Sequence, residues 1–279
     1  MDWRFAVIGD PIEHSLSPRL HTYLMWKCNI SGTYSRIRVR DKPELEGVIG
    51  KLRRNELNGI NITAPWKSEA FNRMDELSPE AKSAGVINTI QSNDGTLVGH
   101  NTDIYGVSES LKQSFDMSNV DSATVIGAGG ASRAVLLALD AINIERVYLV
   151  NRTIANAEEL VMSLSLSNEP KINALDETHL KNRLAESDLV INTLPYSARK
   201  IFDDIQIHSG EDESGKGYLD LLYPKKHLGL LRRMQSAGWT VQDGLDMLIY
   251  QGIAALEFWT GETVQSVVDI SGLREHLRS

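Results

Sequence analysis

The sequence predicts an α/β protein with two domains, one of them built on a doubly wound parallel sheet, and three observations support this. First, an apolar strand, a glycine-rich turn and an alanine-rich helix follow one another over residues 122–141. Second, several short apolar strands end in asparagine, threonine or aspartate side chains. Third, 279 residues are enough for two domains that each bury a hydrophobic core.

Residues 122–134 have the pattern of a dinucleotide-binding turn. The strand Ser122–Ile126 leads into Gly127, and Gly129 lets main-chain N–H groups come close to a pyrophosphate. The following helix points its positive end at the phosphates, and Ser132, in place of a third glycine, is small enough for close packing. The stretch predicts a Rossmann-like cofactor domain, with a plain strand-to-helix turn as the alternative. The residues expected at the cofactor here are Gly127, Ala128, Gly129, Gly130 and Ala131.

The end of the next strand indicates which cofactor is bound. Strand Arg146–Val150 is followed by Asn151, Arg152 and Thr153. A site for NAD usually has an acidic residue here, which accepts hydrogen bonds from the ribose 2′-hydroxyl. Because the chain offers a guanidinium instead, the sequence favours the 2′-phosphate of NADP(H). An exposed strand-end arginine without a ligand is the alternative.

Composition and charge narrow the classes of function. The net charge of −8 argues against a nucleic-acid partner, because an acidic surface repels phosphates. A single cysteine, Cys28, excludes an internal disulfide and fits a reducing compartment. The start of the chain lacks a signal-peptide pattern and no apolar run reaches membrane-spanning length, so we expect a cytoplasmic protein. No cluster of histidine, cysteine and aspartate has the spacing of a metal site.

The first strand, Phe5–Ile8, is followed by a helix that begins near a serine-rich segment. Ser17 is placed as the N-cap of this helix, with Pro18 at the first helical position. Ser15 stands just outside, so its hydroxyl is available for a ligand. The segment therefore either starts a helix and nothing more or contributes a binding site.

The second informative stretch is Asn58–Lys67. In a strand, Asn61 and Thr63 share one face, while Ile60 and Ile62 face the other way. A proline then ends the strand, and a turn could return the amine of Lys67 to the polar surface. The alternative is a strand whose polar face is exposed to solvent and binds no ligand.

The remaining elements place further polar groups at strand ends. Asn88 interrupts an apolar strand over Gly85–Ile90, and Asp103 follows a strand that begins at Leu97. Open α/β sheets bind ligands at such ends. The expected later elements are a strand Thr33–Val39, helices Leu45–Leu57 and Ile154–Leu166, strands Leu189–Leu194 and Tyr218–Leu222, a mobile loop Ser209–Gly217, and a final helix Leu245–Trp259 that carries Gln251 at the edge of its apolar stripe.

Taken together, these stretches resemble the shikimate dehydrogenase family. The matching pieces span nearly the whole chain in the family's order: His14–Pro18, Asn61–Lys67, Asn88-Thr89, Asn101–Asp103, Gly127–Ala134, Asn151–Thr153 and Gly244–Gln251. The resemblance implies a substrate-binding domain of residues 1–104 plus 242–279, an NADP-binding domain of residues 105–241, and an active site in the cleft between them. It also implies the reversible, NADPH-dependent reduction of 3-dehydroshikimate to shikimate, with monomer and homodimer both open.

The resemblance further implies roles for single residues. Lys67 and Asp103 would be the catalytic pair, and Ser15 and Ser17 would hold the substrate carboxylate. The other residues implied at the substrate are Asn61, Thr63, Asn88, Asp103, Tyr223 and Gln251. Asn151, Arg152, Thr153, Leu221 and Gly244 would join the glycine turn at the cofactor. Two departures are Asn156, where the family often has lysine, and the segment Asn192–Ser197, which differs from the usual Asn-Ala-Thr-Pro-x-Gly.

The implied chemistry is consistent with this pair. Hydride addition to a ketone leaves an alkoxide, which needs a proton or a stabilising positive charge, and a carboxylate next to Lys67 favours its ammonium form. The sequence leaves both roles open for Lys67. Three rival functions also remain: a quinate or dual-specificity dehydrogenase, a non-catalytic NADP-binding sensor, and a reductase of another small carbonyl compound.

Overall fold

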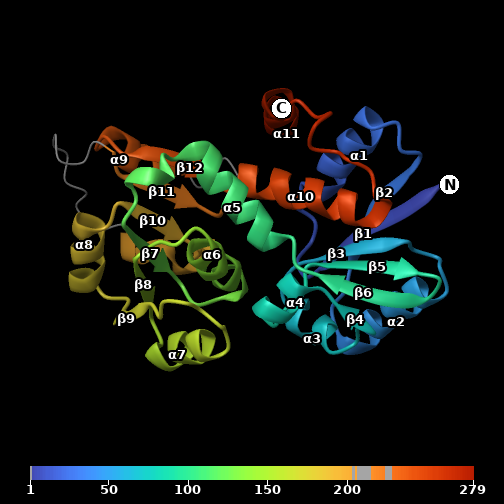
Figure 1. The fold of residues 1–279 in the computed structure, drawn as a ribbon, viewed down its shortest axis with the longest axis horizontal. Coiled ribbons are helices and arrows are strands. Elements are labelled where there is room, and N and C mark those ends of the chain that lie inside the picture. The colour runs from blue at the N-terminus through green and yellow to red at the C-terminus, as the bar shows by residue number, and fades with distance from the viewer. Residues whose placement is uncertain (1, 203–204, 206–214, 224–227) are drawn as a thin grey trace. The chain divides into compact units, whose positions relative to one another are not determined.

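The chain folds into two compact units, each with a six-stranded sheet (Figure 1). The computed structural model describes residues 2–202, 205, 215–223 and 228–279. Unit 1 comprises Met1–Gly106 and Leu248–Ser279, and unit 2 comprises Val107–Met247. Two helices, α5 (Asp103–Ser114) and α10 (Leu245–Thr260), cross from one unit to the other along the chain. Most of the loop predicted over Ser209–Gly217 lies outside the described residues.

The sheet of unit 1 is mixed, with the strand order β2-β1-β3-β5-β6-β4. β1 pairs in parallel with both β2 and β3, whereas β5 is antiparallel to both β3 and β6. The strand predicted over Gly85–Ile90 starts later, at Thr89, and Gly85 is instead the left-handed C-cap of the helix Pro79–Ala84. The strands are β1 (Trp3–Gly9), β2 (Gly32–Arg38), β3 (Gly59–Ile62), β4 (Glu76–Leu77), β5 (Thr89–Asn93) and β6 (Thr96–His100).

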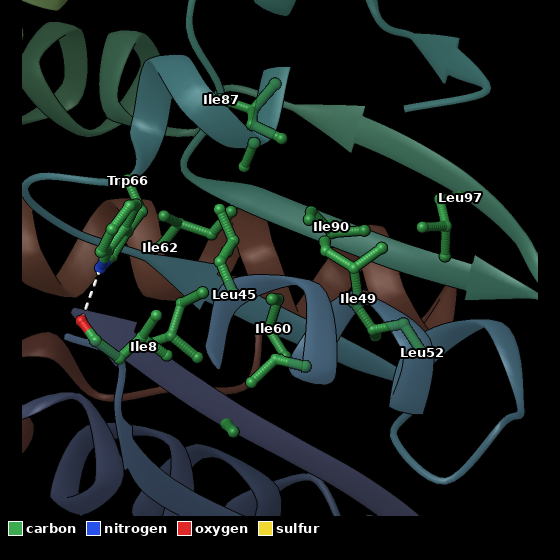
Figure 2. Close-up of a cluster of buried hydrophobic side chains, with 14 of the residues drawn as sticks. Ile8, Leu45, Ile49, Leu52, Ile60, Ile62, Trp66, Ile87, Ile90 and Leu97 are labelled. Carbon is green, nitrogen blue, oxygen red and sulfur yellow. Dashed lines mark hydrogen bonds between the residues drawn. The ribbon is translucent and has the colours of Figure 1, made fainter. Parts of the chain in front are cut away.

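One face of this sheet packs on helix α2 (Lys42–Arg53). Ile60 and Ile62 of β3 are buried there among apolar side chains of α2 such as Leu45 (Figure 2). The indole N–H of Trp66 closes the end of the cluster by donating to the carbonyl oxygen of Val39 at 2.7 Å (Figure 2). The predicted alternation of β3 is therefore confirmed, and Asn61 is left for the opposite face.

The opposite face packs on α10 and on α1 (Ser17–Lys27). Trp259 of α10 stacks on Phe5 of β1 at 4.4 Å between ring centroids, and its indole N–H donates to the carbonyl oxygen of Ile90 at 2.9 Å. Gly59 of β3 must lack a side chain, since a Cβ there would collide with the indole of Trp259. The shorter helices of this unit are α3 (Lys67–Phe71), α4 (Pro79–Ala84) and α11 (Ile270–Arg278).

The sheet of unit 2 is parallel throughout, with the order β12-β11-β10-β7-β8-β9. The chain moves outwards from β7 to β9 and then returns to β10 beside β7, so the sheet is doubly wound and the Rossmann-like prediction is confirmed. Its strands are β7 (Ser122–Ile126), β8 (Arg146–Asn151), β9 (Lys171–Ala174), β10 (Leu189–Asn192), β11 (Gly217–Asp220) and β12 (Thr240–Asp243). Its helices are α6 (Gly130–Ala141), α7 (Ile154–Met162), α8 (Glu177–Glu186) and α9 (Leu228–Ser236).

The described residues contain no candidate membrane-spanning helix and no candidate metal cluster. None of their helices is long and apolar enough to cross a bilayer. No group of three or more histidine, cysteine, aspartate or glutamate side chains is arranged to hold a metal ion within the same parts of the chain.

Candidate substrate and cofactor sites

The centre of the candidate substrate site is an ion pair between Lys67 and Asp103. Lys67 is the first residue of α3 and Asp103 the first of α5, and Nζ lies 2.5 Å from Oδ2. The side chains are 21% and 9% exposed. The second carboxylate oxygen of Asp103 accepts a hydrogen bond from Nδ2 of Asn88 at 2.8 Å. Both oxygens are thus held, and the lysine amine keeps some access to solvent.

Asn88 connects this pair to the end of β6 and to α10. Its Oδ1 accepts the main-chain N–H of Thr102 at 2.8 Å, while Nδ2 also lies 2.9 Å from Oγ1 of Thr102. Nδ2 is 3.4 Å from Oε1 of Gln251, whose own amide donates to the carbonyl oxygen of Leu248. Asn88 therefore orients Asp103 while it joins three segments of unit 1.

Asn61 belongs to the same buried polar cluster. Its Nδ2 donates to Oγ1 of Thr89 at 3.0 Å, and its Oδ1 accepts the hydroxyl of Tyr34 at 2.7 Å. Burial raises the pKa of the Tyr34 phenol well above its ordinary value. Thr63, half-buried just beyond β3, has a hydroxyl without a hydrogen bond to any described residue and is thus free for a ligand.

Ser15 and Ser17 lie at the start of α1, but the predicted capping role of Ser17 is wrong. The helix begins at Ser17 itself, and Leu16 is the N-cap without a side-chain bond. Ser15 takes over part of this role, since its Oγ accepts the main-chain N–H of Ser17 at 3.2 Å. The Ser17 hydroxyl, which the helix start does not use, lies against the phenol of Tyr34.

A fully buried histidine lies on α1, about one turn after Ser17. His21 of α1 stacks on Tyr34 with 4.3 Å between ring centroids, and both of its ring nitrogens lack a hydrogen-bond partner among the described residues. Burial lowers its pKa from 6.5 to about 3. The ring is therefore neutral in the folded protein at neutral pH.

Sequence reasoning missed Tyr34, Thr89 and Thr102 as members of this cluster. Thr89 and Thr102 each follow an asparagine in the motifs Asn88-Thr89 and Asn101–Asp103, and that adjacency is the available signal. Tyr34 gave no local signal, because its hydroxyl reaches Asn61 only through the pairing of β2, β1 and β3.

In unit 2, the turn between β7 and α6 has the shape of a phosphate-binding loop. Gly127 has φ of 105°, a conformation that favours glycine, and a Cβ there would meet Oγ1 of Thr193. Oγ of Ser132 accepts the N–H of Gly129 at 3.1 Å and donates to the carbonyl oxygen of Gly127 at 2.8 Å. The space where a Cβ of Gly129 or Gly130 would lie is open to 4 Å. The turn is held by these hydrogen bonds and is accessible, as a pyrophosphate site requires.

Two further groups would lie around a bound dinucleotide. Asn151 at the end of β8 accepts the N–H of Ala128 at 3.1 Å. Arg152 is exposed and forms no ion pair or hydrogen bond with the described residues. The first turns of α6 and α7, at Ala131 and after Thr153, contain no acidic residue. These residues therefore fit a dinucleotide with an additional 2′-phosphate.

The ends of β11 and β12 approach each other closely. A Cβ on Gly244 would collide with the carbonyl oxygen of Leu221, so only glycine allows this approach. Tyr223 follows two residues later and is half-buried. The predicted Leu221 and Gly244 thus lie together within unit 2.

Comparison with known families and proteins identifies the class of this chain. Residues 7–90 match the shikimate dehydrogenase substrate binding domain, residues 109–226 match shikimate / quinate 5-dehydrogenase, and residues 244–265 match the shikimate 5′-dehydrogenase C-terminal domain. The shikimate dehydrogenase (NADP⁺) of Pelagibacter ubique is 34% identical over 91% of this chain and 92% of its own. That of Desulforamulus reducens is 34% identical over 92% and 90%.

Solved structures agree with these matches. A shikimate 5-dehydrogenase from Thermus thermophilus in complex with NADP(H) and shikimate has a TM-score of 0.80 and 33% identity, covering 99% of this chain and 98% of that one. A shikimate 5-dehydrogenase from Listeria monocytogenes in complex with shikimate and NAD has a TM-score of 0.83 and 27% identity, covering 99% and 96%. With its sequence, its domain matches and its fold in agreement, this chain belongs to the shikimate dehydrogenase family.

Proposed function

We propose that this protein is an NADP-dependent shikimate dehydrogenase that reversibly reduces 3-dehydroshikimate to shikimate, with Lys67 and Asp103 at the reacting oxygen. The observation that carries this proposal is their ion pair of 2.5 Å within a buried polar cluster. We assign substrate binding to residues 1–104 with 242–279, and cofactor binding to residues 105–241. We place this activity in the cytoplasm, on a small-molecule substrate.

Lys67 is the residue that we assign to the alkoxide oxygen as it develops. NADPH, when bound, supplies the hydride that the ketone carbon accepts. The carbonyl oxygen gains negative charge in that step, and the ammonium of Lys67 either donates a proton to it or stabilises the charge. Asp103 holds the ammonium in position, and Asn88 fixes Asp103 through its second oxygen.

The surrounding polar side chains bind the rest of the substrate. Ser15 and Ser17 hold the carboxylate, with two hydroxyl groups at the start of α1. The ring hydroxyls meet polar donors and acceptors, all neutral except Asp103, which suits a polyhydroxylated acid better than an apolar ketone. The residues assigned to them are Asn61, Thr63, Asn88, Asp103, Tyr223 and Gln251.

The cofactor is assigned to the glycine turn and the strand end beside it. The residues assigned to the pyrophosphate are Gly127, Ala128, Gly129, Gly130 and Ala131, at the positive N-terminal end of α6. Arg152, free of other charged partners in the described part of the chain, takes the 2′-phosphate with Asn151 and Thr153. Leu221 and Gly244 lie beside the nicotinamide.

The test is the reduction of NADP⁺ by the purified protein, followed by the absorbance of NADPH, with shikimate and with quinate in parallel. Turnover with shikimate supports the proposal. Equal turnover with quinate would make the protein a dual-specificity dehydrogenase. Binding of NADP⁺ without turnover of either acid would refute the enzymatic function and favour a sensor.

A further inference from the structure

The segment around β2 carries three arginines, of which Arg36 alone lacks an acidic partner among the described residues. The neighbouring acids are engaged elsewhere: Asp10 and Glu13 pair with Arg38 at 2.7 and 3.5 Å, and Glu44 pairs with Arg40 at 3.5 Å. The positive charge of Arg36 therefore has no acidic partner in the described part of the chain, whereas Arg38 and Arg40 each face at least one carboxylate.

Arg36 is hydrogen-bonded to Ser15 in the short segment that leads into α1, the serine loop. Its Nε and Nη2 donate to the carbonyl oxygen of Ser15 at 3.2 and 2.7 Å. The Ser15 hydroxyl in turn accepts the N–H of Ser17 at 3.2 Å. The remaining nitrogen, Nη1, has no hydrogen bond to any part of the chain that the structure describes. One guanidinium thus holds the serine loop and still has donors to offer.

The sheet register places Arg36 of β2 level with Asn61 of β3, in one row that runs across the strands through β1. Val7 of β1 is the partner of Arg36 on one side and of Asn61 on the other. Paired residues on adjacent strands point to the same face, and strands lie about 4.8 Å apart. Tyr34, two positions earlier on this face of β2, already reaches Asn61 with its hydroxyl. Arg36 therefore stands at the edge of the polar row, where the serine loop passes.

We propose that Arg36 supplies the positive charge of the subsite that binds the substrate carboxylate, beyond the two serine hydroxyls. This inference rests on the proposed function. Two hydroxyl groups can donate hydrogen bonds to a carboxylate but do not offset its charge. A guanidinium supplies both hydrogen bonds and a positive charge, and charge-assisted hydrogen bonds are about twice as strong as neutral ones.

The experiment compares shikimate with its methyl ester, which has the same ring but no charge. Arg36→Met removes the charge and the hold on Ser15, while Arg36→Lys keeps the charge as a single-point donor. Arg40→Met is the matched control, since it removes one exposed charge from the same segment. Dissociation constants for both ligands are measured by titration calorimetry without cofactor, and kcat and KM are measured for the acid.

Arg36→Met is expected to weaken binding of the acid about tenfold, which is about 1.4 kcal/mol, and to leave binding of the ester within about twofold. Its KM for NADP⁺ and its kcat should stay within about twofold, and Arg40→Met should change nothing. Arg36→Lys should bind the acid within about threefold of the unaltered protein.

Two results would overturn the inference. Equal weakening of acid and ester in Arg36→Met would show that Arg36 only holds the serine loop. Unchanged affinity for the acid would show that its charge does not reach the ligand. Because the titrations need no turnover, a protein that binds shikimate through Arg36 but fails to reduce NADP⁺ would refute the proposed function and leave this inference standing.

Discussion

Replacing Lys67 by methionine tests the catalytic assignment most directly. The change keeps an apolar stem of similar length and removes the amine that lies 2.5 Å from Asp103. Loss of a proton-transfer group costs about 10²–10⁴-fold in rate, or about 3–5 kcal/mol of activation free energy. Because this interaction develops in the transition state, kcat should fall by that factor, and KM for shikimate should change much less.

The same substitution leaves a carboxylate without its cation. Asp103 is 9% exposed and retains the hydrogen bond from Asn88, so the melting temperature should fall. Adding Asp103→Asn removes the stranded charge and should recover the melting temperature, whereas kcat should stay low. Calorimetry and steady-state kinetics on the single and double variants separate the two effects.

Lys82→Met is the control, since Lys82 is an exposed lysine of α4 outside the site. Its kinetic constants should match those of the unaltered protein. A Lys67→Met variant with near-normal kcat and a raised KM would refute the reasoning. Lys67 would then be a binding residue, and Asp103 would have to carry the proton transfer.

Three other perturbations have defined outcomes. Arg152→Ala should weaken NADP⁺ binding by about 1–3 kcal/mol and leave NAD⁺ binding unchanged, which titration with both cofactors checks; equal losses would separate Arg152 from the 2′-phosphate. Gly59→Ala forces a Cβ into the indole of Trp259 and should lower the free energy of unfolding by about 1–3 kcal/mol, whereas Gly47→Ala, in open space on α2, should raise it by about 0.5–1 kcal/mol in the same denaturant titration. Burial holds the pKa of His21 at about 3, below its ordinary 6.5, so the unfolded chain binds more protons between these values. The stability due to neutral His21 is then complete above pH 6.5 and is lost as the pH falls towards 3, by about 1.4 kcal/mol per unit. His21→Phe should flatten this dependence in unfolding curves recorded at pH 7 and pH 5, and an unchanged slope would assign the dependence to other groups.

The parts of the structure that the sequence predicted are those with local signals. The turn at Gly127 and the alternation of Ile60 and Asn61 depend on neighbours in the chain, and both are confirmed by the structure. Tyr34 and Arg36 depend instead on which strands pair and in what register, which no short motif encodes. The pairing of β2, β1 and β3 brings Tyr34 to Asn61 and places Arg36 level with it.

The start of α1 also differs from the prediction, because residue type alone does not decide which side chain caps the helix. Ser17 has the residue type and position of an N-cap, but Ser15 accepts its N–H, and Leu16 takes the capping position instead. Both serines have the residue type of an N-cap, so the preference of serine for that position does not tell which of them bonds to the helix start. The Ser17 hydroxyl, which makes no capping bond, is one of the two that we assign to the substrate carboxylate.

The discontinuity of unit 1 has a consequence for how the molecule forms on the ribosome. Trp259 of α10 bonds to Ile90 across 169 positions, and all of Val107–Met247 is synthesised between the two parts of this unit. At about 5–20 residues per second, these 141 residues take roughly 7–28 s to appear. During that interval the nascent sheet face at Phe5 and Gly59 lacks the indole that covers it, while the strands of unit 2 are synthesised one after another up to β12. The middle of the sequence can therefore reach its native fold first, and the half that contains Lys67 and Asp103 must wait, with an apolar surface open to chaperones, for the segment that follows.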